Sequence, residues 1–153
     1  MSFSQKITRE QATEIILLAK KEKGLTFDEI AEVVGRHPVW VASAIMGQAT
    51  MNAEEADKLV ELLGVESSVS AALQEFPLKG SLDERVPVDP LIYRFHELTQ
   101  VYGTTIKAII NEKFGDGIMS AIDFKMDIDK EEDPAGDRVV ITLNGKFLPY
   151  KKW

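Results

Sequence analysis

The stretch DPLIYRFHELTQVYGTTIKAIINEKFGDGIMSAIDF, residues 89–124, decides the fold of the second half of this chain. Its first part has the apolar spacing of helices, and Asp89 with the proline after it forms a favourable start for a helix to about Tyr102. Gly103 predicts a break, followed by a second helix that runs to Phe114. After the Gly-Asp-Gly turn the apolar residues alternate, which is the pattern of a strand.

The alternation continues towards the C-terminus. Residues 118–128 and 139–143 predict strands, and KEEDPAGD (residues 130–137) predicts the turn between them. Asn144 followed by Gly145 predicts a further tight hairpin turn. Two or three strands after helices make a small sheet with exposed edges, which is marginally stable alone. We therefore expect this half to associate with other chains.

The first half carries helix start and stop signals. Thr26 and Glu29 form a capping-box pattern, a proline opens the next helix, and glycines follow three of the apolar runs. The sequence thus predicts an α+β protein: a five-helix bundle over residues 1–76, a linker over 77–89, and a helix-plus-antiparallel-β unit over 90–153. The expected helices of the bundle cover residues 7–23, 26–34, 38–46, 52–63 and 68–75.

The composition is that of an ordinary globular protein, with 44% hydrophobic and 28% charged residues among 153. The formal net charge of -7 counts against nucleic acid as the main partner. The absence of cysteine excludes disulfides, thiolate metal ligands and a cysteine nucleophile. The start of the chain lacks the apolar run of a signal peptide, and the nearby stretch 15–19 is too short to span a bilayer. We expect a cytoplasmic protein with no membrane association.

One alternative is a transcriptional regulator with a C-terminal oligomerising, ligand-sensing unit. Ala31, Gly35 and Val41 have helix-turn-helix spacing. However, the helix that would read DNA offers only Ser43 as a polar side chain, where base recognition needs Arg, Lys, Asn or Gln. Residues 1–76 carry 7 basic and 12 acidic side chains, which also disfavours DNA.

Arg94 and Glu97 are the first candidates for a functional site. Helical spacing places them together on one flank of an apolar stripe. One interpretation is an ordinary ion pair on a solvated face. The other is a partly buried pocket, in which a guanidinium grips a small anion with two hydrogen bonds and a glutamate moves a proton. The sequence pattern alone leaves both interpretations open.

Ser120 is the third candidate, because it has the same parity as Ile118 and Ile122 and should point with them to the core. A buried hydroxyl needs a partner, which is either backbone or substrate. The turn at residues 114–117 is either an anion-binding nest of N–H groups or simply the end of the helix. No spacing of His, Asp and Glu predicts a metal site, and His96 falls away from Arg94 on the helix.

These segments resemble the cyanase (cyanate hydratase) family. The resemblance is most specific in YRFHELTQVYGTT (residues 93–105), EKFGDGIMSAIDF (112–124) and GKFLPY (145–150). The first half is similar in layout, including GLTFDEIA (24–31). One departure is His96, where the family more often has tyrosine. The resemblance implies a helix-turn-helix, lambda-repressor-like bundle followed by a catalytic and dimerisation unit.

The resemblance also implies the chemistry. The family's catalytic arginine, glutamate and serine fall on Arg94, Glu97 and Ser120. The implied reaction is the bicarbonate-dependent decomposition of cyanate to ammonia and carbon dioxide through carbamate, with no metal or organic cofactor. The implied assembly is a homodecamer of five dimers, with active sites where subunits meet and with no nucleic-acid partner.

Overall fold

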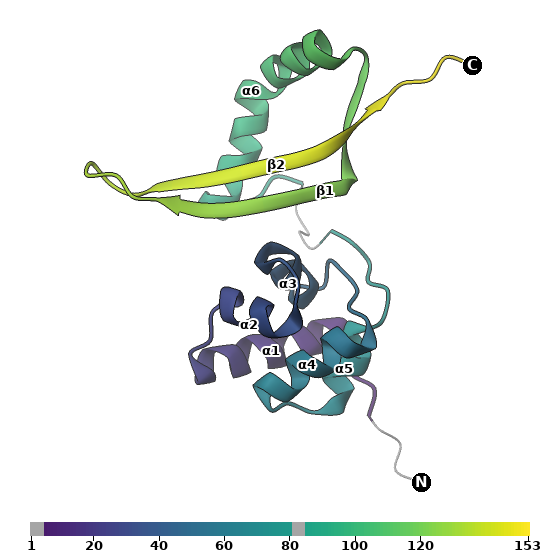
Figure 1. The fold of residues 1–153 in the computed structure, drawn as a ribbon, viewed down its shortest axis with the longest axis vertical. Helices are drawn as coiled ribbons and strands as arrows, with labels where there is room; N and C mark the ends of the chain where they lie inside the picture. The colour runs from purple at the N-terminus through teal and green to yellow at the C-terminus, as the bar shows by residue number, and fades with distance from the viewer. Residues whose placement is uncertain (1–4, 81–84) are drawn as a thin grey trace. The chain divides into compact units, whose positions relative to one another are not determined.

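The computed structural model describes residues 5–80 and 85–153, and the chain divides into two compact units, residues 1–81 and 82–153. The predicted α+β class is confirmed (Figure 1). The first unit contains α1 (Arg9–Lys23), α2 (Phe27–Val34), α3 (Pro38–Ile45), α4 (Ala53–Leu63) and α5 (Ser67–Leu73). The second contains α6 (Pro90–Phe114), β1 (Gly117–Glu131) and β2 (Arg138–Pro149).

Short polar motifs set the ends of α2 and α3, as the sequence predicts. The Glu29 N–H donates to the Thr26 hydroxyl at 3.1 Å, and the Thr26 N–H donates to the Glu29 carboxylate at 2.8 Å. This capping box satisfies two of the N–H groups left free at a helix start. Gly35 ends α2 with φ 83°, a left-handed conformation that glycine adopts without steric cost. Pro38 then opens α3.

Apolar side chains from all five helices form the core of the first unit. Arg9 reinforces it, because its guanidinium donates to the carbonyl of Ala72 at 2.7 Å and to that of Ala49. Burial lowers the pKa of Arg9, and the nearby charge of Glu75 opposes this shift. The largest fully buried core side chains are Ile16, Ile30, Val41, Ile45, Met51, Leu59, Val69 and Leu73.

Helix α6 is continuous over 25 residues, so the predicted break at Gly103 is wrong. Its start is fixed by Asp89, whose carboxylate accepts the N–H groups of Leu91 at 2.9 Å and Ile92 at 3.0 Å. A glycine inside a helix costs about 1 kcal/mol relative to alanine. That penalty weakens the helix without breaking it, since the hydrogen bonds of the neighbouring turns continue past the glycine.

Strands β1 and β2 form an antiparallel pair, and the chain reverses between Glu131 and Arg138 as the sequence predicts. The predicted hairpin turn at Asn144 and Gly145 is wrong. Both residues lie inside β2, and Gly145 pairs with Phe124 of β1. The Asn-Gly signal marks an irregular part of the strand pair and not a reversal of the chain.

The irregularity is a large bulge in β1. Met119 pairs with Phe147, and Phe124 pairs with Gly145, so the four residues 120–123 lie opposite a single residue of β2. Bulges bend the strand that carries the extra residues. Figure 1 accordingly shows a sharp corner in β1. The bulge breaks the side-chain alternation that the sequence pattern assumes.

The second unit buries very little by itself. Among its described residues, 85–153, only Gly117 and Ser120 are buried, and α6 buries no side chain. Exposed apolar side chains in such number are typical of surfaces that contact other molecules. Exposed apolar side chains of α6 and the strands include Leu91, Phe95, Leu98, Val101, Tyr102, Ile106, Ile109, Phe114, Ile122, Ile128, Val139 and Leu143.

Candidate active site

Arg94 and Glu97 lie one turn apart on α6 and form an ion pair. Nη1 of Arg94 lies 2.6 Å from Oε2 of Glu97. The two side chains are 60% and 46% exposed in the single chain, so water screens their attraction. An exposed pair at this spacing stabilises a helix by only ~0.2–0.5 kcal/mol. The strength of the attraction between the two side chains therefore depends on whether another surface covers them and excludes water.

Aromatic rings adjoin this pair. The guanidinium carbon of Arg94 lies 5.9 Å from the ring centroid of Tyr93. The Tyr93 and His96 rings are 5.8 Å apart and tilted by 37°. His96 thus packs beside the Tyr93 ring, the same ring that lies near the Arg94 guanidinium.

Ser120 lies in the bulge of β1 and is only 6% exposed. Its Oγ accepts the backbone N–H groups of Ile122 at 3.0 Å and Asp123 at 2.9 Å. The expected burial of Ser120 is correct. The expectation that Ile118 and Ile122 point to the core with it is wrong, because these side chains are 46% and 97% exposed. The bulge between Met119 and Phe124 changes the parity between Ser120 and Ile122.

The structure brings Arg94 and Glu97 together but joins neither of them to Ser120 by a hydrogen bond between described residues. The turn before the bulge ends α6: Gly115 has φ 97°, and its N–H donates to the Asn111 carbonyl at 2.9 Å. This N–H therefore caps the helix, which favours the helix-end interpretation of the turn over an anion nest.

Comparisons with known proteins identify the family. Residues 84–152 match the family model described as the cyanate lyase C-terminal domain. Residues 9–77 match the model described as cyanate hydratase, N-terminal. This chain belongs to the cyanate hydratase family.

Individual members of the family resemble the chain over nearly its whole length. The cyanate hydratase of Synechococcus sp. (strain CC9311) is 60% identical over 141 residues, which cover 92% of this chain and 94% of that protein. That of Prochlorococcus marinus (strain NATL2A) is 57% identical over 143 residues, covering 94% and 97%. The crystal structure of cyanase from T. urticae has a TM-score of 0.81 and 41% identity, covering 90% of this chain and 96% of that one.

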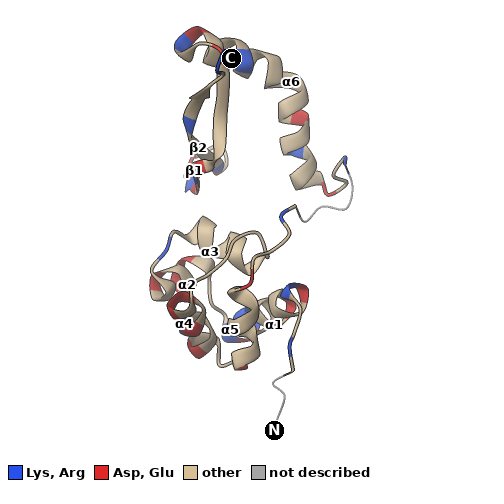
Figure 2. Cartoon of the chain, turned by 90° about the vertical axis from the view of Figure 1, so that its right-hand side faces the viewer, with Lys and Arg blue, Asp and Glu red and all other residues tan. Residues whose placement is uncertain are grey.

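Family membership extends to the helix-turn-helix half, where the structure does not favour DNA reading. Helix α3 contains no Arg, Lys, Asn or Gln. The basic side chain just before it, Arg36, donates to Oε1 of Glu55 at 3.0 and 3.2 Å and lies over the Trp40 ring at 5.6 Å. Several acidic residues mark α4 in Figure 2. Arg36 thus contacts Glu55 and Trp40 of its own unit, with 56% of its side chain exposed, and the regulator alternative is not favoured.

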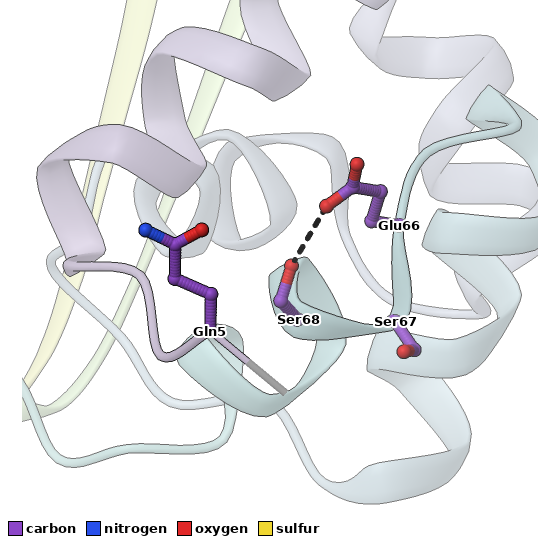
Figure 3. Close-up of a pocket in the computed structure, with 4 residues that line it drawn as sticks. All are labelled: Gln5, Glu66, Ser67 and Ser68. Atoms are coloured by element: carbon purple, nitrogen blue, oxygen red, sulfur yellow. Dashed lines mark hydrogen bonds between the residues drawn. The ribbon is translucent and has the colours of Figure 1, made fainter. Parts of the chain in front are cut away.

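Other candidate sites in the described parts of the chain do not fit an anionic substrate. A hollow of about 380 Å³ in the first unit is lined by Gln5, Glu66, Ser67 and Ser68 (Figure 3). The Ser68 hydroxyl lies 3.5 Å from the Glu66 carboxylate, and no basic side chain lines the hollow. The described residues hold no cluster of metal-ligating side chains. None of the described helices combines the length and apolar character needed to cross a membrane.

Gly145 is the residue near Ser120 whose position the sequence analysis missed. A Cβ on Gly145 would overlap the carbonyl oxygen of Ser120. The sequence does carry a signal for this close contact, because an isolated glycine inside a strand pattern indicates a close approach of another backbone segment. The asparagine before Gly145 favoured a turn instead.

Proposed function

We propose that this chain is a cyanate hydratase that converts cyanate and bicarbonate to ammonia and carbon dioxide through carbamate. The observation that carries the proposal is that both units of the chain match the family. The second unit also holds an arginine–glutamate pair, Arg94 and Glu97, and a buried serine, Ser120, which the resemblance to the family assigns to catalysis. The proposed reaction needs anion binding and proton transfer, so it requires no metal or organic cofactor.

Arg94 holds the anions in this proposal. A guanidinium keeps its charge at all physiological pH values and matches a carboxylate-like anion with two parallel N–H groups. It offsets the repulsion between two anionic substrates and stabilises the charge of the transition state. Glu97, whose carboxylate lies 2.6 Å from Arg94, orients the guanidinium and mediates the proton transfer.

Ser120 orients one of the anions. Its hydroxyl proton is not used in the two backbone hydrogen bonds that its oxygen accepts. A buried O–H group donates to an oxyanion more effectively than a solvated one, because water does not compete for the acceptor. Ser120 therefore complements Arg94 by adding a neutral donor to a charged one.

The reaction follows from these roles. A bicarbonate oxygen attacks the cyanate carbon and forms a dianionic intermediate. Proton transfer and cleavage of a carbon–oxygen bond release carbon dioxide from the bicarbonate carbon and leave carbamate. Carbamate then takes up a proton and breaks down to ammonia and a second molecule of carbon dioxide. Two protons are consumed in all.

We also propose that the active site is completed in a homodecamer of five dimers. In the single chain Arg94 is 60% exposed, and the second unit exposes most of its apolar side chains. Contact with other chains would bury this surface and remove water from the ion pair. Charge interactions are several times stronger in such a site than in water. Each chain contributes one arginine, Arg94, to the proposed site, which is a small positive charge for two anions, so convergence of chains at each site supports the reaction.

A labelling experiment tests this route. Protein is incubated with ¹³C-bicarbonate and unlabelled cyanate, and the gas formed is followed by mass spectrometry. We expect one labelled and one unlabelled carbon dioxide for each ammonia, because one carbon comes from each substrate. Direct hydrolysis of cyanate by water would release ammonia without consuming labelled bicarbonate, and that result would contradict the proposed route.

A further inference from the structure

Gly145 lies where β2 comes close to the bulge that carries Ser120. It is the β2 residue that pairs with Phe124, at the end of the irregular segment 120–123. Its φ is not in the left-handed region, so its backbone conformation does not require glycine. Glycine is required because the neighbouring atoms leave no room for a side chain. A Cβ there would overlap the Ser120 carbonyl oxygen and would lie 2.5 Å from Cγ of Met119, well inside van der Waals contact.

The same bulge fixes the hydrogen-bonding capacity of the Ser120 hydroxyl. A hydroxyl has two lone pairs and one proton. The Oγ of Ser120 already accepts the N–H groups of Ile122 and Asp123. Its two accepting positions are therefore occupied, and its proton is the group left to offer. The path of the backbone from 120 to 123 thus makes this serine a hydrogen-bond donor.

We propose that Gly145 is a positioning residue for the reaction: by leaving room for the Ser120 carbonyl, it holds the bulge in the form that directs the Ser120 hydroxyl proton to a substrate oxyanion. This inference rests on the proposed function, in which Ser120 contacts substrate. A side chain at position 145 would push the Ser120 carbonyl away. Both backbone hydrogen bonds to Oγ depend on that local geometry, so the hydroxyl would lose its direction.

The test compares Gly145→Ala with Gly103→Ala. The control places a methyl group in α6 whose nearest heavy atom is Cγ2 of Thr99 at 3.8 Å, an ordinary contact. We expect Gly145→Ala to lower kcat/KM by about 10-fold or more, since complete loss of a donor of this kind costs about 100- to 1,000-fold. The loss should be distributed between kcat and KM in the same proportion as in Ser120→Ala. Gly103→Ala should stay within about twofold of the wild type.

A double-mutant cycle separates positioning from a general structural role. If Gly145 acts through the Ser120 hydroxyl, Gly145→Ala should have little further effect on activity in a Ser120→Ala background. Independent, multiplying losses would overturn the proposal. Amide hydrogen exchange gives a readout without activity: Gly145→Ala should speed the exchange of the Ile122 and Asp123 N–H groups, and unchanged exchange would also overturn it.

The double variant Met119→Ala/Gly145→Ala tests the proposal if Gly145→Ala alone fails to fold. Of the three atoms nearest to the new methyl group, two belong to the Met119 side chain and are removed, and the Ser120 carbonyl oxygen stays. This pair should fold and should lose activity relative to Met119→Ala alone. Full activity in it would overturn the proposal. A wild-type protein without cyanate turnover would instead refute the proposed function, and the exchange of the two amides would then decide whether Gly145 holds the bulge.

Discussion

Replacement of Arg94 by alanine removes the guanidinium that we propose binds the anionic substrates. We expect kcat/KM for cyanate to fall by about 100-fold or more, in the range seen when a preorganised charge donor is lost. Arg94→Lys should retain part of the activity, because lysine keeps the charge but not the planar pair of donors. The measurement is steady-state ammonia release.

The matched control is Lys107→Ala, which removes a positive charge from the same helix outside the proposed site. It should change activity little. Near-wild-type turnover by Arg94→Ala, at unchanged oligomer size, would contradict the assignment of Arg94.

The site residues differ in how far the sequence could place them. Arg94 and Glu97 are one turn apart on a helix, and helical spacing alone brings their side chains together. The burial of Ser120 was predicted from strand parity, although its surroundings are set by a bulge. A bulge depends on how one strand pairs with another, so parity within one strand cannot reveal it. No sequence pattern shows whether another chain covers the exposed ion pair.

The ion pair between the α2–α3 turn and α4 gives a prediction for stability. Arg36 is the partner of Glu55, whose side chain is only 9% exposed. Its Oε2 is buried without a hydrogen-bond partner in the described structure. We expect Arg36→Ala to destabilise the protein by about 1–3 kcal/mol, because it leaves a buried carboxylate uncompensated. Thermal and urea unfolding at fixed protein concentration measure the effect.

Lys58→Ala is the control for Arg36→Ala. Lys58 pairs with Glu54 on the surface of α4, where the two side chains are 46% and 76% exposed. Its loss should change stability by no more than about 0.5 kcal/mol. Equal effects of the two substitutions would show that the Arg36–Glu55 pair contributes no more than a surface pair.

The elements of the first unit were predictable because each helix carries local signals for its own start and end. The capping box at Thr26 and Glu29 and the stop at Gly35 act within a few residues. The two errors in element boundaries, at Gly103 and at Asn144 with Gly145, both came from treating a glycine as a local signal. In α6 the adjoining helical turns outweighed the glycine, and in β2 the partner strand determined its role.

The whole chain should assemble, since the second unit has almost no interior of its own. We expect a particle of about 170 kDa, the mass of ten chains of 17.1 kDa. Light scattering coupled to size-exclusion chromatography measures this mass. Dilution or mild urea that dissociates the particle should abolish turnover at the same point. A fully active particle of 17.1 kDa would refute the shared active site.

The interior of the first unit could be predicted from one chain, because its apolar stripes face one another within that chain. The interior of the second unit could not be predicted in this way, because many of its apolar residues are exposed, among them Ile122, Val139 and Leu91. Their side chains are largely uncovered by the described part of their own unit, so a surface that would bury them lies outside what a single chain supplies. The small number of buried apolar residues in the second unit predicts an oligomer, but it does not predict how the chains are arranged in that oligomer.

Cyanate decomposition with bicarbonate is the central claim, and ammonia release tests it most directly. Purified, assembled protein is incubated with cyanate in carbon-dioxide-depleted buffer, with and without added bicarbonate. We predict ammonia release that depends on bicarbonate and exceeds the slow uncatalysed background. No release above background from a correctly assembled oligomer, with bicarbonate present, would contradict the proposed function.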